Sequence, residues 1–132
     1  MLKRNKRFLL MLLTLALPLG CVGCSVGGSV TYDQISGAEA KALMDSESGY
    51  IIIDARTQEE YDQGHIPGAI MIPEYEIVDR AEKELPDKDQ LILVYCRSGR
   101  RSKIAAEELV KLGYTNVKEL GGIIDWEYEI VK

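Results

Sequence analysis

A cysteine stands between a strongly apolar run and a helical pattern, and this junction constrains the fold of the chain more than any other feature. Residues 96–102 read Cys-Arg-Ser-Gly-Arg-Arg-Ser; they follow the apolar run 91–95 and precede the helical pattern 104–110. A short continuous apolar run is typical of a strand buried on both faces. We therefore expect Cys96 at the carboxyl end of a buried strand and at the amino terminus of a helix.

This position favours the thiolate form of Cys96. Backbone N–H groups at a helix N-terminus point toward an anion, and the helix dipole adds partial positive charge there. Nearby cations lower the pKa of a thiol further, and only the thiolate is nucleophilic. Three arginines lie within five residues after Cys96. The residues thus predict a catalytic cysteine in an anion-binding loop.

Apolar runs alternate with helical patterns along the rest of the chain. Capping boxes and apolar periodicity predict helices over 36–46, 57–61, 74–85 and 102–112, and a final helix from Ile123 with Trp126 packed inward. Apolar runs predict strands over 50–53, 69–72, 91–95 and 116–120. The helix over 74–85 is expected to bury one face, consisting of Ile77, Val78, Ala81 and Leu85.

This alternation has a consequence for both the fold and the site. Strands that alternate with helices form a mainly parallel sheet with helices on both faces. Ligands of such sheets bind beyond the carboxyl ends of the strands, which is where Cys96 is expected. The sequence therefore predicts an α/β domain with its site at the end of the strand 91–95.

The first 24 residues have the layout of a secretory signal peptide. Basic residues within 3–7 precede an apolar stretch over 8–19 and then small residues. Cys21 and Cys24 each follow a small residue, in boxes that resemble those of lipidated bacterial lipoproteins. The sequence leaves open whether Cys24 or Cys21 is lipidated, and whether the segment is instead an uncleaved membrane anchor. We expect a signal peptide over 1–24, a linker over 25–31, and a domain over 32–132 outside the cytoplasm, attached to the cell membrane.

Charge and cysteine content exclude several other classes of function. The chain has 16 Lys and Arg against 21 Asp and Glu, and its basic residues include four before Phe8, so the rest is acidic and disfavours nucleic acid as a partner. Beyond Cys24 only Cys96 remains, so it has no partner for an internal disulfide. The Cys21–Cys24 pair lacks a second pair of ligands, and we expect neither a metal nor a cofactor.

Three segments together resemble the rhodanese (thiosulfate sulfurtransferase) domain family. They are Ile53-Asp54-Ala55-Arg56 with Gly64-His65-Ile66-Pro67-Gly68-Ala69, then the Cys96 loop, and then Leu120-Gly121-Gly122 with Trp126. Their order and spacing match, and the resemblance covers about 32–132. It implies a rhodanese-like α/β fold with a mainly parallel five-stranded sheet flanked by helices on both faces.

The resemblance also implies a sulfurtransferase that works through a persulfide. Cys96 would take a sulfane sulfur from thiosulfate or polysulfide and pass it to cyanide or a thiol, with ping-pong kinetics. Another protein could serve as sulfur donor or acceptor. The persulfide would be bound by the backbone and side chains of the loop, namely Arg97, Ser98, Gly99, Arg100, Arg101 and Ser102. Asp54 and Arg56 are expected to brace this loop, and Arg101 to turn inward toward Asp54 or Glu60.

Alternative interpretations of the same residues remain open. Tyrosine-phosphatase-type enzymes use a Cys-x5-Arg loop, whereas Arg101 here gives Cys-x4-Arg, and this smaller ring suits one sulfur atom better than a phosphate. A non-catalytic binding or sulfur-sensing module would share the fold, although an intact cysteine loop argues against it. His65 lies in a Gly-His-Ile-Pro-Gly turn, which favours a structural role over a Cys–His pair.

Overall fold

The computed structural model describes residues 31–132; Cys21, Cys24 and the expected signal peptide lie outside them. Its centre is a five-stranded sheet of order β1-β5-β4-β2-β3, in which every pair of neighbouring strands is parallel. The strands are β1 (Asp33–Gln34), β2 (Ile51–Asp54), β3 (Ile70–Met71), β4 (Ile92–Cys96) and β5 (Val117–Gly122). The α/β fold with a parallel five-stranded sheet is confirmed.

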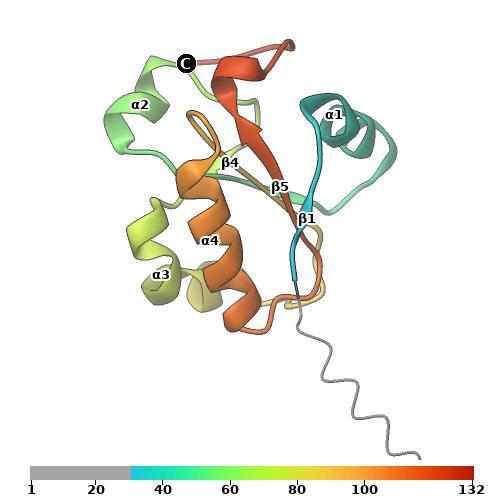
Figure 1. Cartoon of the computed structure of the whole chain (residues 1–132), viewed down its shortest axis with the longest axis vertical. Coiled ribbons are helices and arrows are strands. Elements are labelled where there is room, and N and C mark those ends of the chain that lie inside the picture. Colours follow the sequence, from blue (N-terminus) through green and yellow to red (C-terminus); the bar gives the residue numbers. More distant parts are fainter. Residues whose placement is uncertain (1–30) are drawn as a thin grey trace, which may run out of the picture.

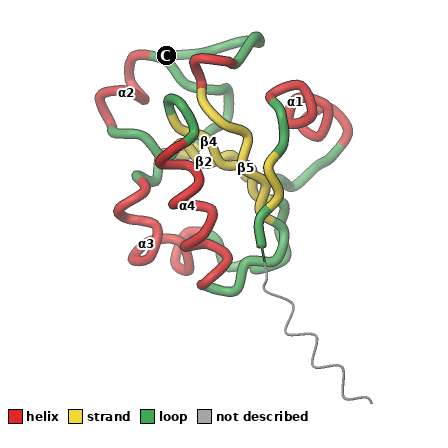
Figure 2. Tube along the Cα trace, viewed as in Figure 1, coloured by secondary structure: helices red, strands yellow, loops and turns green. Residues whose placement is uncertain are grey.

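Helices cover both faces of this sheet, as expected. They are α1 (Gly37–Ser46), α2 (Gln58–Gln63), α3 (Ile77–Glu84) and α4 (Arg100–Lys111), with 3-10 turns at η1 (Glu74–Glu76) and η2 (Ile123–Asp125). Figure 1 shows α3 and α4 side by side on one face and α1 on the other. The tube in Figure 2 shows the strands between these two helical layers.

The two layers bury alternate residues of the central strands. In β4, Val94 packs into the cluster that includes α3 and α4, whereas its neighbour Leu93 packs into the cluster on the α1 side. Both side chains have no exposed surface. Burial of one such side chain stabilises the fold by about 1.5–3 kcal/mol. Cys96 belongs to the same cluster as Val94, so it lies on the α4 side of the sheet.

Local sequence signals set the start of two helices. The hydroxyl of Ser36 accepts a hydrogen bond from the Glu39 N–H, and the Glu39 carboxylate accepts one from the Ser36 N–H. The same reciprocal pair joins Thr57 and Glu60 at the start of α2. Each capping box satisfies donors that a helix N-terminus leaves free. Both predictions are confirmed.

Three local predictions are wrong: the final helix, the single helix over 74–85, and the burial of Val78. Ile123 begins a 3-10 turn rather than a final helix, because the chain then extends and Val131 forms an antiparallel bridge with His65. Trp126 nevertheless packs inward, with 8% of its surface exposed. The segment 74–85 divides into η1 and α3, and Val78 is 54% exposed because the buried stripe runs at four-residue spacing through Ile77, Ala81 and Leu85.

The edge strand β1 is absent from the sequence-based strand predictions. Its two residues, Asp33 and Gln34, are polar and exposed, so they lack the apolar run that marks the other strands. Their pairing with Lys118 and Glu119 of β5 adds them to the sheet. Within residues 31–132, no helix combines the length and apolar character that crossing a bilayer requires.

Candidate active site

The loop between β4 and α4 closes around the sulfur of Cys96. β4 ends at Cys96, and Gly99 turns the chain into α4 with a left-handed φ of 106°. A residue with a side chain is strained at such a φ, whereas glycine adopts it freely. The turn brings the Gly99 N–H within 3.0 Å of Cys96 Sγ, and the cysteine side chain is only 1% exposed.

This environment lowers the pKa of the Cys96 thiol below its ordinary value. Burial of the sulfur acts in the opposite direction and raises the pKa, because it penalises the charged form. Hydrogen bonding from the Ser102 hydroxyl and from the N–H groups of Ser102, Gly99 and Ser98 outweighs that penalty. These donors stabilise an anion at Sγ, so Cys96 is suited to act as a nucleophile.

The end of β5 supports the loop from the side. Cys96 pairs with Gly122 after a register shift that begins at Val94. A Cβ atom at Gly122 would meet the carbonyl oxygen of Arg97 at 2.0 Å, so the loop backbone occupies the space of the missing side chain. The Ile124 N–H donates to the same carbonyl oxygen at 3.3 Å. The Gly121-Gly122 segment and the Cys96 loop therefore pack directly together.

Arg101 is bound within the fold. Its Nη1 and Nη2 donate to the two carboxylate oxygens of Glu60 at 2.7 and 2.8 Å, and this pair links α4 to α2. Hydrogen bonding from Arg101, together with hydrogen bonds from Thr57, lowers the pKa of Glu60 to about 2. Of the two partners considered from the sequence, Asp54 and Glu60, the structure pairs Arg101 with Glu60. The hydrogen bond with Glu60 raises the pKa of Arg101, and a smaller contribution comes from charge attraction between Arg101 and Cys96.

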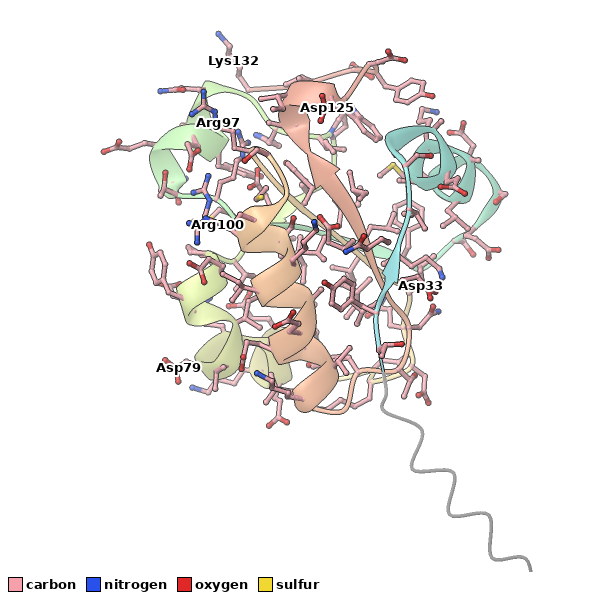
Figure 3. All side chains as sticks on the ribbon, in the orientation of Figure 1. Asp33, Asp79, Arg97, Arg100, Asp125 and Lys132 are labelled. Atoms are coloured by element: carbon pink, nitrogen blue, oxygen red, sulfur yellow. The ribbon has the colours of Figure 1, made fainter. Side chains whose placement is uncertain are left out.

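Arg97 and Arg100 lie at the exposed side of the loop. Figure 3 shows both on the same side of the molecule, close to the point where β4 continues into α4. Both are exposed, as is Ser98 between them. Within residues 31–132, neither arginine forms an ion pair. Their charges are thus available to an anion that approaches the loop.

Asp54 and Arg56 form a buried pair next to β4. Arg56 Nε and Nη2 donate to the Asp54 carboxylate at 2.7–3.1 Å, and Nη2 also donates to the Gly64 carbonyl at 2.7 Å. The Tyr95 hydroxyl donates to Asp54 at 2.6 Å and accepts from the Ile66 N–H at 3.1 Å. Burial and the Asp54 carboxylate raise the pKa of Tyr95. The pair therefore holds Tyr95, the residue before Cys96, and the turn over 64–66 by hydrogen bonds.

His65 is engaged in that turn. Its ring stacks on Tyr61 with centroids 3.7 Å apart, and its Nδ1 lies 3.0 Å from the Tyr61 carbonyl oxygen. Its backbone exchanges two hydrogen bonds with Val131, at 2.8 and 2.9 Å. These contacts account for His65 as a structural residue. Among residues 31–132, no group of three or more His, Cys, Asp or Glu side chains is arranged to hold a metal ion.

Sequence reasoning missed Glu119, a buried carboxylate beside the loop. Glu119 is 2% exposed, and its Oε1 lies 2.5 Å from the Ser102 hydroxyl and 2.7 Å from the Gly121 nitrogen. A signal was present in the sequence. Strand alternation places Glu119 on the same side as the apolar Val117, where an acidic residue must find hydrogen-bond donors.

Comparison with known proteins gives one consistent result. The family model described as Rhodanese-like domain matches residues 36–129. Thiosulfate sulfurtransferase PspE of Escherichia coli (strain K12) is 45% identical over 73 residues, which are 55% of this chain and 70% of that protein. Putative sulfur carrier protein YrkF of Bacillus subtilis (strain 168) is 39% identical over 94 residues, 70% of this chain and 50% of that protein.

A solved structure described as a rhodanese with anions from E. coli superposes with a TM-score of 0.60 at 42% identity. The match covers 63% of this chain and 98% of the solved one. Fold and sequence therefore agree on the same family.

Proposed function

We propose, since the chain belongs to the rhodanese-like domain family, that it is a sulfurtransferase that carries a sulfane sulfur on Cys96. One observation carries this proposal: the Gly99 N–H donates to Cys96 Sγ at 3.0 Å, at the N-terminus of α4. A relative with 45% identity bears the name thiosulfate sulfurtransferase. The nearly complete burial of the sulfur favours a donor with a slender terminal sulfur, such as thiosulfate or polysulfide.

In the first step the Cys96 thiolate attacks the outer sulfur of thiosulfate. The new S–S bond gives a persulfide, and the old S–S bond breaks with its electron pair leaving on sulfite. The N–H groups of Ser98, Gly99 and Ser102, which already act on the thiolate, stabilise the anionic sulfur. The loop thus does not need a separate base to start the reaction.

In the second step an acceptor takes the outer sulfur. Cyanide or a thiolate attacks that sulfur, the persulfide bond breaks, and Cys96 leaves as the thiolate that began the cycle. The same donors that lower the pKa of Cys96 make it a better leaving group. A thiol acceptor can be a small molecule or belong to another protein; one relative is named as a putative sulfur carrier protein.

Arg97 and Arg100 are proposed to attract the anionic donor. Both are exposed beside the loop, and the surrounding domain is acidic, so they form a local positive surface. Ser98 and Gly99 contribute through their backbone N–H groups, and Ser102 contributes through its hydroxyl and its N–H group. Arg101 contributes its charge while bound to Glu60.

We also propose that the protein is a lipoprotein outside the cytoplasm, with Cys24 or Cys21 as the lipidated residue. The support is the sequence of the signal-like segment 1–24. Thr31 precedes β1 at the amino end of the parallel sheet, and Cys96 lies at its carboxyl end (Figure 1). Metabolic labelling with palmitate, compared between Cys24→Ser and Cys21→Ser, tests which residue is modified.

Intact mass of the purified protein tests the sulfur transfer. Incubation with thiosulfate or polysulfide should add the mass of one sulfur atom to Cys96, and cyanide should remove it as thiocyanate. Cys96→Ser is the matched control and should gain no sulfur while keeping its circular dichroism spectrum. Absence of a gain with either donor would favour the non-catalytic binding or sulfur-sensing module.

A further inference from the structure

Glu119 of β5 is a buried carboxylate that the proposed sulfur transfer leaves unused. Its side chain is 2% exposed, and within residues 31–132 it forms no ion pair with a lysine or arginine. Burial of such a polar group is costly unless hydrogen bonds compensate it. Two contacts do so, both through Oε1, and both reach segments that lie beside the Cys96 loop.

The first contact fixes the bend near the end of β5. The Gly121 N–H donates to Glu119 Oε1 at 2.7 Å. Gly121 bends the strand with a left-handed φ of 87°, and the next residue, Gly122, packs against the Arg97 carbonyl group. The Glu119 carboxylate therefore stabilises the bend that brings the end of β5 against the loop.

The second contact joins β5 to the first turn of α4. The Ser102 hydroxyl oxygen lies 2.5 Å from Glu119 Oε1 and 3.0 Å from the carbonyl oxygen of Gly99. Gly99 also packs directly on β5, because a Cβ atom built at Gly99 would stand 3.7 Å from Gly121 Cα and 4.0 Å from Glu119 Oε1. The carboxylate thus lies beside Gly99, between the end of β5 and the start of α4.

Gly99 is the residue whose N–H donates to Cys96 Sγ at 3.0 Å. We infer that Glu119 is a positioning residue whose Oε1 holds the Gly99 amide in place against the Cys96 sulfur. It acts by bridging Gly121 of β5 and Ser102 of α4. The inference deepens the proposed function and rests on it, because a preorganised amide stabilises the anionic sulfur during transfer. The role needs an acceptor oxygen at this position rather than a negative charge, since both partners are neutral groups.

The arginines near the loop do not depend on Glu119. Arg97 and Arg100 are exposed, and within residues 31–132 neither forms a hydrogen bond or ion pair with Glu119. Arg101 is held by Glu60 instead. Substitution of Glu119 should therefore change the rate of the chemical step and leave KM for the donor nearly unchanged.

Two conservative substitutions separate the position of the oxygen from its charge. Glu119→Gln keeps an acceptor oxygen at the same chain length and is neutral, whereas Glu119→Asp keeps the charge and draws the oxygen back by about 1.5 Å. With thiosulfate as donor and cyanide as acceptor, Glu119→Asp should lower kcat about tenfold, because misplacement by about 1 Å is enough for such a loss. Its KM for thiosulfate should stay within about twofold of wild type, and Glu119→Gln should keep kcat within about threefold.

The pH dependence of Cys96 alkylation by iodoacetamide, read from intact mass, gives a second measure without any sulfur donor. If the Gly99 amide moves away from the sulfur, the thiolate loses a hydrogen bond and the pKa of the thiol rises. Glu119→Asp should move the midpoint up by about 0.5–1 pH unit, and Glu119→Gln should keep the wild-type midpoint. A purely structural residue would change the unfolding temperature and not this midpoint.

Val117→Ala is the matched control for lost stability. Val117 is 3% exposed and lies on the same face of β5 as Glu119, nearer the amino end of the strand and farther from the loop. Its substitution should lower the unfolding temperature and keep both kcat and the midpoint, with every assay run below the unfolding transition. If Glu119→Asp does not fold, Glu119→Met removes the acceptor oxygen in its place, and the same losses are expected.

Three outcomes would overturn the inference. Wild-type kcat and midpoint in Glu119→Asp would show that the position of the oxygen does not matter. Losses in Glu119→Gln equal to those in Glu119→Asp would assign the effect to the charge of the carboxylate. A loss of kcat in Val117→Ala as large as that in Glu119→Asp would assign it to a general loss of stability.

Failure of this inference is distinguishable from failure of the proposed function. The alkylation midpoints report on the loop even where no sulfur is transferred. A wild-type protein that gains no sulfur from thiosulfate or polysulfide contradicts the sulfurtransferase proposal whatever the midpoints show. Conversely, wild-type sulfur transfer with the wrong pattern among the variants contradicts only the role of Glu119.

Discussion

Gly122 lies against the carbonyl group of Arg97, so closely that a Cβ atom at position 122 would stand 2.0 Å from the carbonyl oxygen and 2.6 Å from Ser98 Cα. The backbone of Gly122 is ordinary extended chain, with φ −117° and ψ 150°. The position therefore requires glycine for space rather than for conformation. The reactive loop keeps its shape because β5 presents no side chain there.

Substitution Gly122→Ala should displace the Cys96 loop and abolish sulfur transfer. The atoms that the new methyl group meets belong to backbone, which cannot move aside as a flexible side chain can. Overpacking of this kind costs about 1–3 kcal/mol of stability. Steady-state turnover and thermal unfolding together measure the effect. Gly37→Ala is the matched control, because its Cβ meets the Trp126 ring at 3.4 Å, and it should keep both activity and stability. Full turnover in Gly122→Ala would contradict the packing argument.

Breaking the buried pair Asp54–Arg56 should cost more free energy of unfolding than removing the neighbouring Tyr95 hydroxyl. Asp54→Asn leaves the Arg56 guanidinium, 6% exposed, without its countercharge, and such a loss costs about 3–5 kcal/mol. Tyr95→Phe removes one hydroxyl and leaves the Ile66 N–H without an acceptor, which costs about 1–3 kcal/mol. Urea unfolding of both variants gives the comparison. Equal losses, or a larger loss in Tyr95→Phe, would contradict this ranking.

The ion pair Arg101–Glu60 predicts a specific dependence of stability on pH. Arg101, as the largest cause, and the Thr57 hydrogen bonds hold the pKa of Glu60 at about 2, below its ordinary value of 4.5. A depressed pKa contributes stability that is complete above about pH 4.5 and is lost as the pH falls through about 2. The unfolding temperature of Glu60→Gln should thus lie below that of the wild type at pH 6, and the gap should shrink by pH 2.5.

Glu59→Gln is the matched control for this experiment. Glu59 is an exposed neighbour on α2 and forms no ion pair within residues 31–132. Its substitution should leave the unfolding temperature close to the wild-type value at both pH values. A constant gap between Glu60→Gln and the wild type from pH 6 to pH 2.5 would show that the ion pair does not set the acid response.

The parts of the fold that the sequence predicted correctly depend on local signals. The capping boxes at Ser36 and Thr57 are four-residue patterns, and the structure contains both. The run 91–95 is apolar throughout because β4 is buried on both faces, and that alone indicates a central strand. The same run, followed a few residues later by a helical pattern, also predicts that Cys96 lies between a strand and a helix.

The parts that the sequence did not predict depend on contacts between distant segments. β1 consists of two polar residues and exists only because β5 offers a backbone edge. The segment after Ile123 extends because Val131 pairs with His65, and no local pattern indicates that bridge. The buried carboxylate of Glu119 accepts a hydrogen bond from Ser102, which lies on another element. Composition and periodicity contain no information about such pairings.

Arg97 is one of the two exposed arginines that we propose to attract the anionic donor. Arg97→Ala should raise KM for thiosulfate several-fold and lower kcat less, because an exposed cation attracts the donor about equally in the ground state and the transition state. The effect should weaken at high salt, since the side chain is solvent-exposed. Lys83→Ala on α3 removes the same charge from another exposed site and should leave KM unchanged. An unchanged KM in Arg97→Ala would exclude Arg97 from donor binding and leave Arg100 as the remaining exposed arginine of the loop.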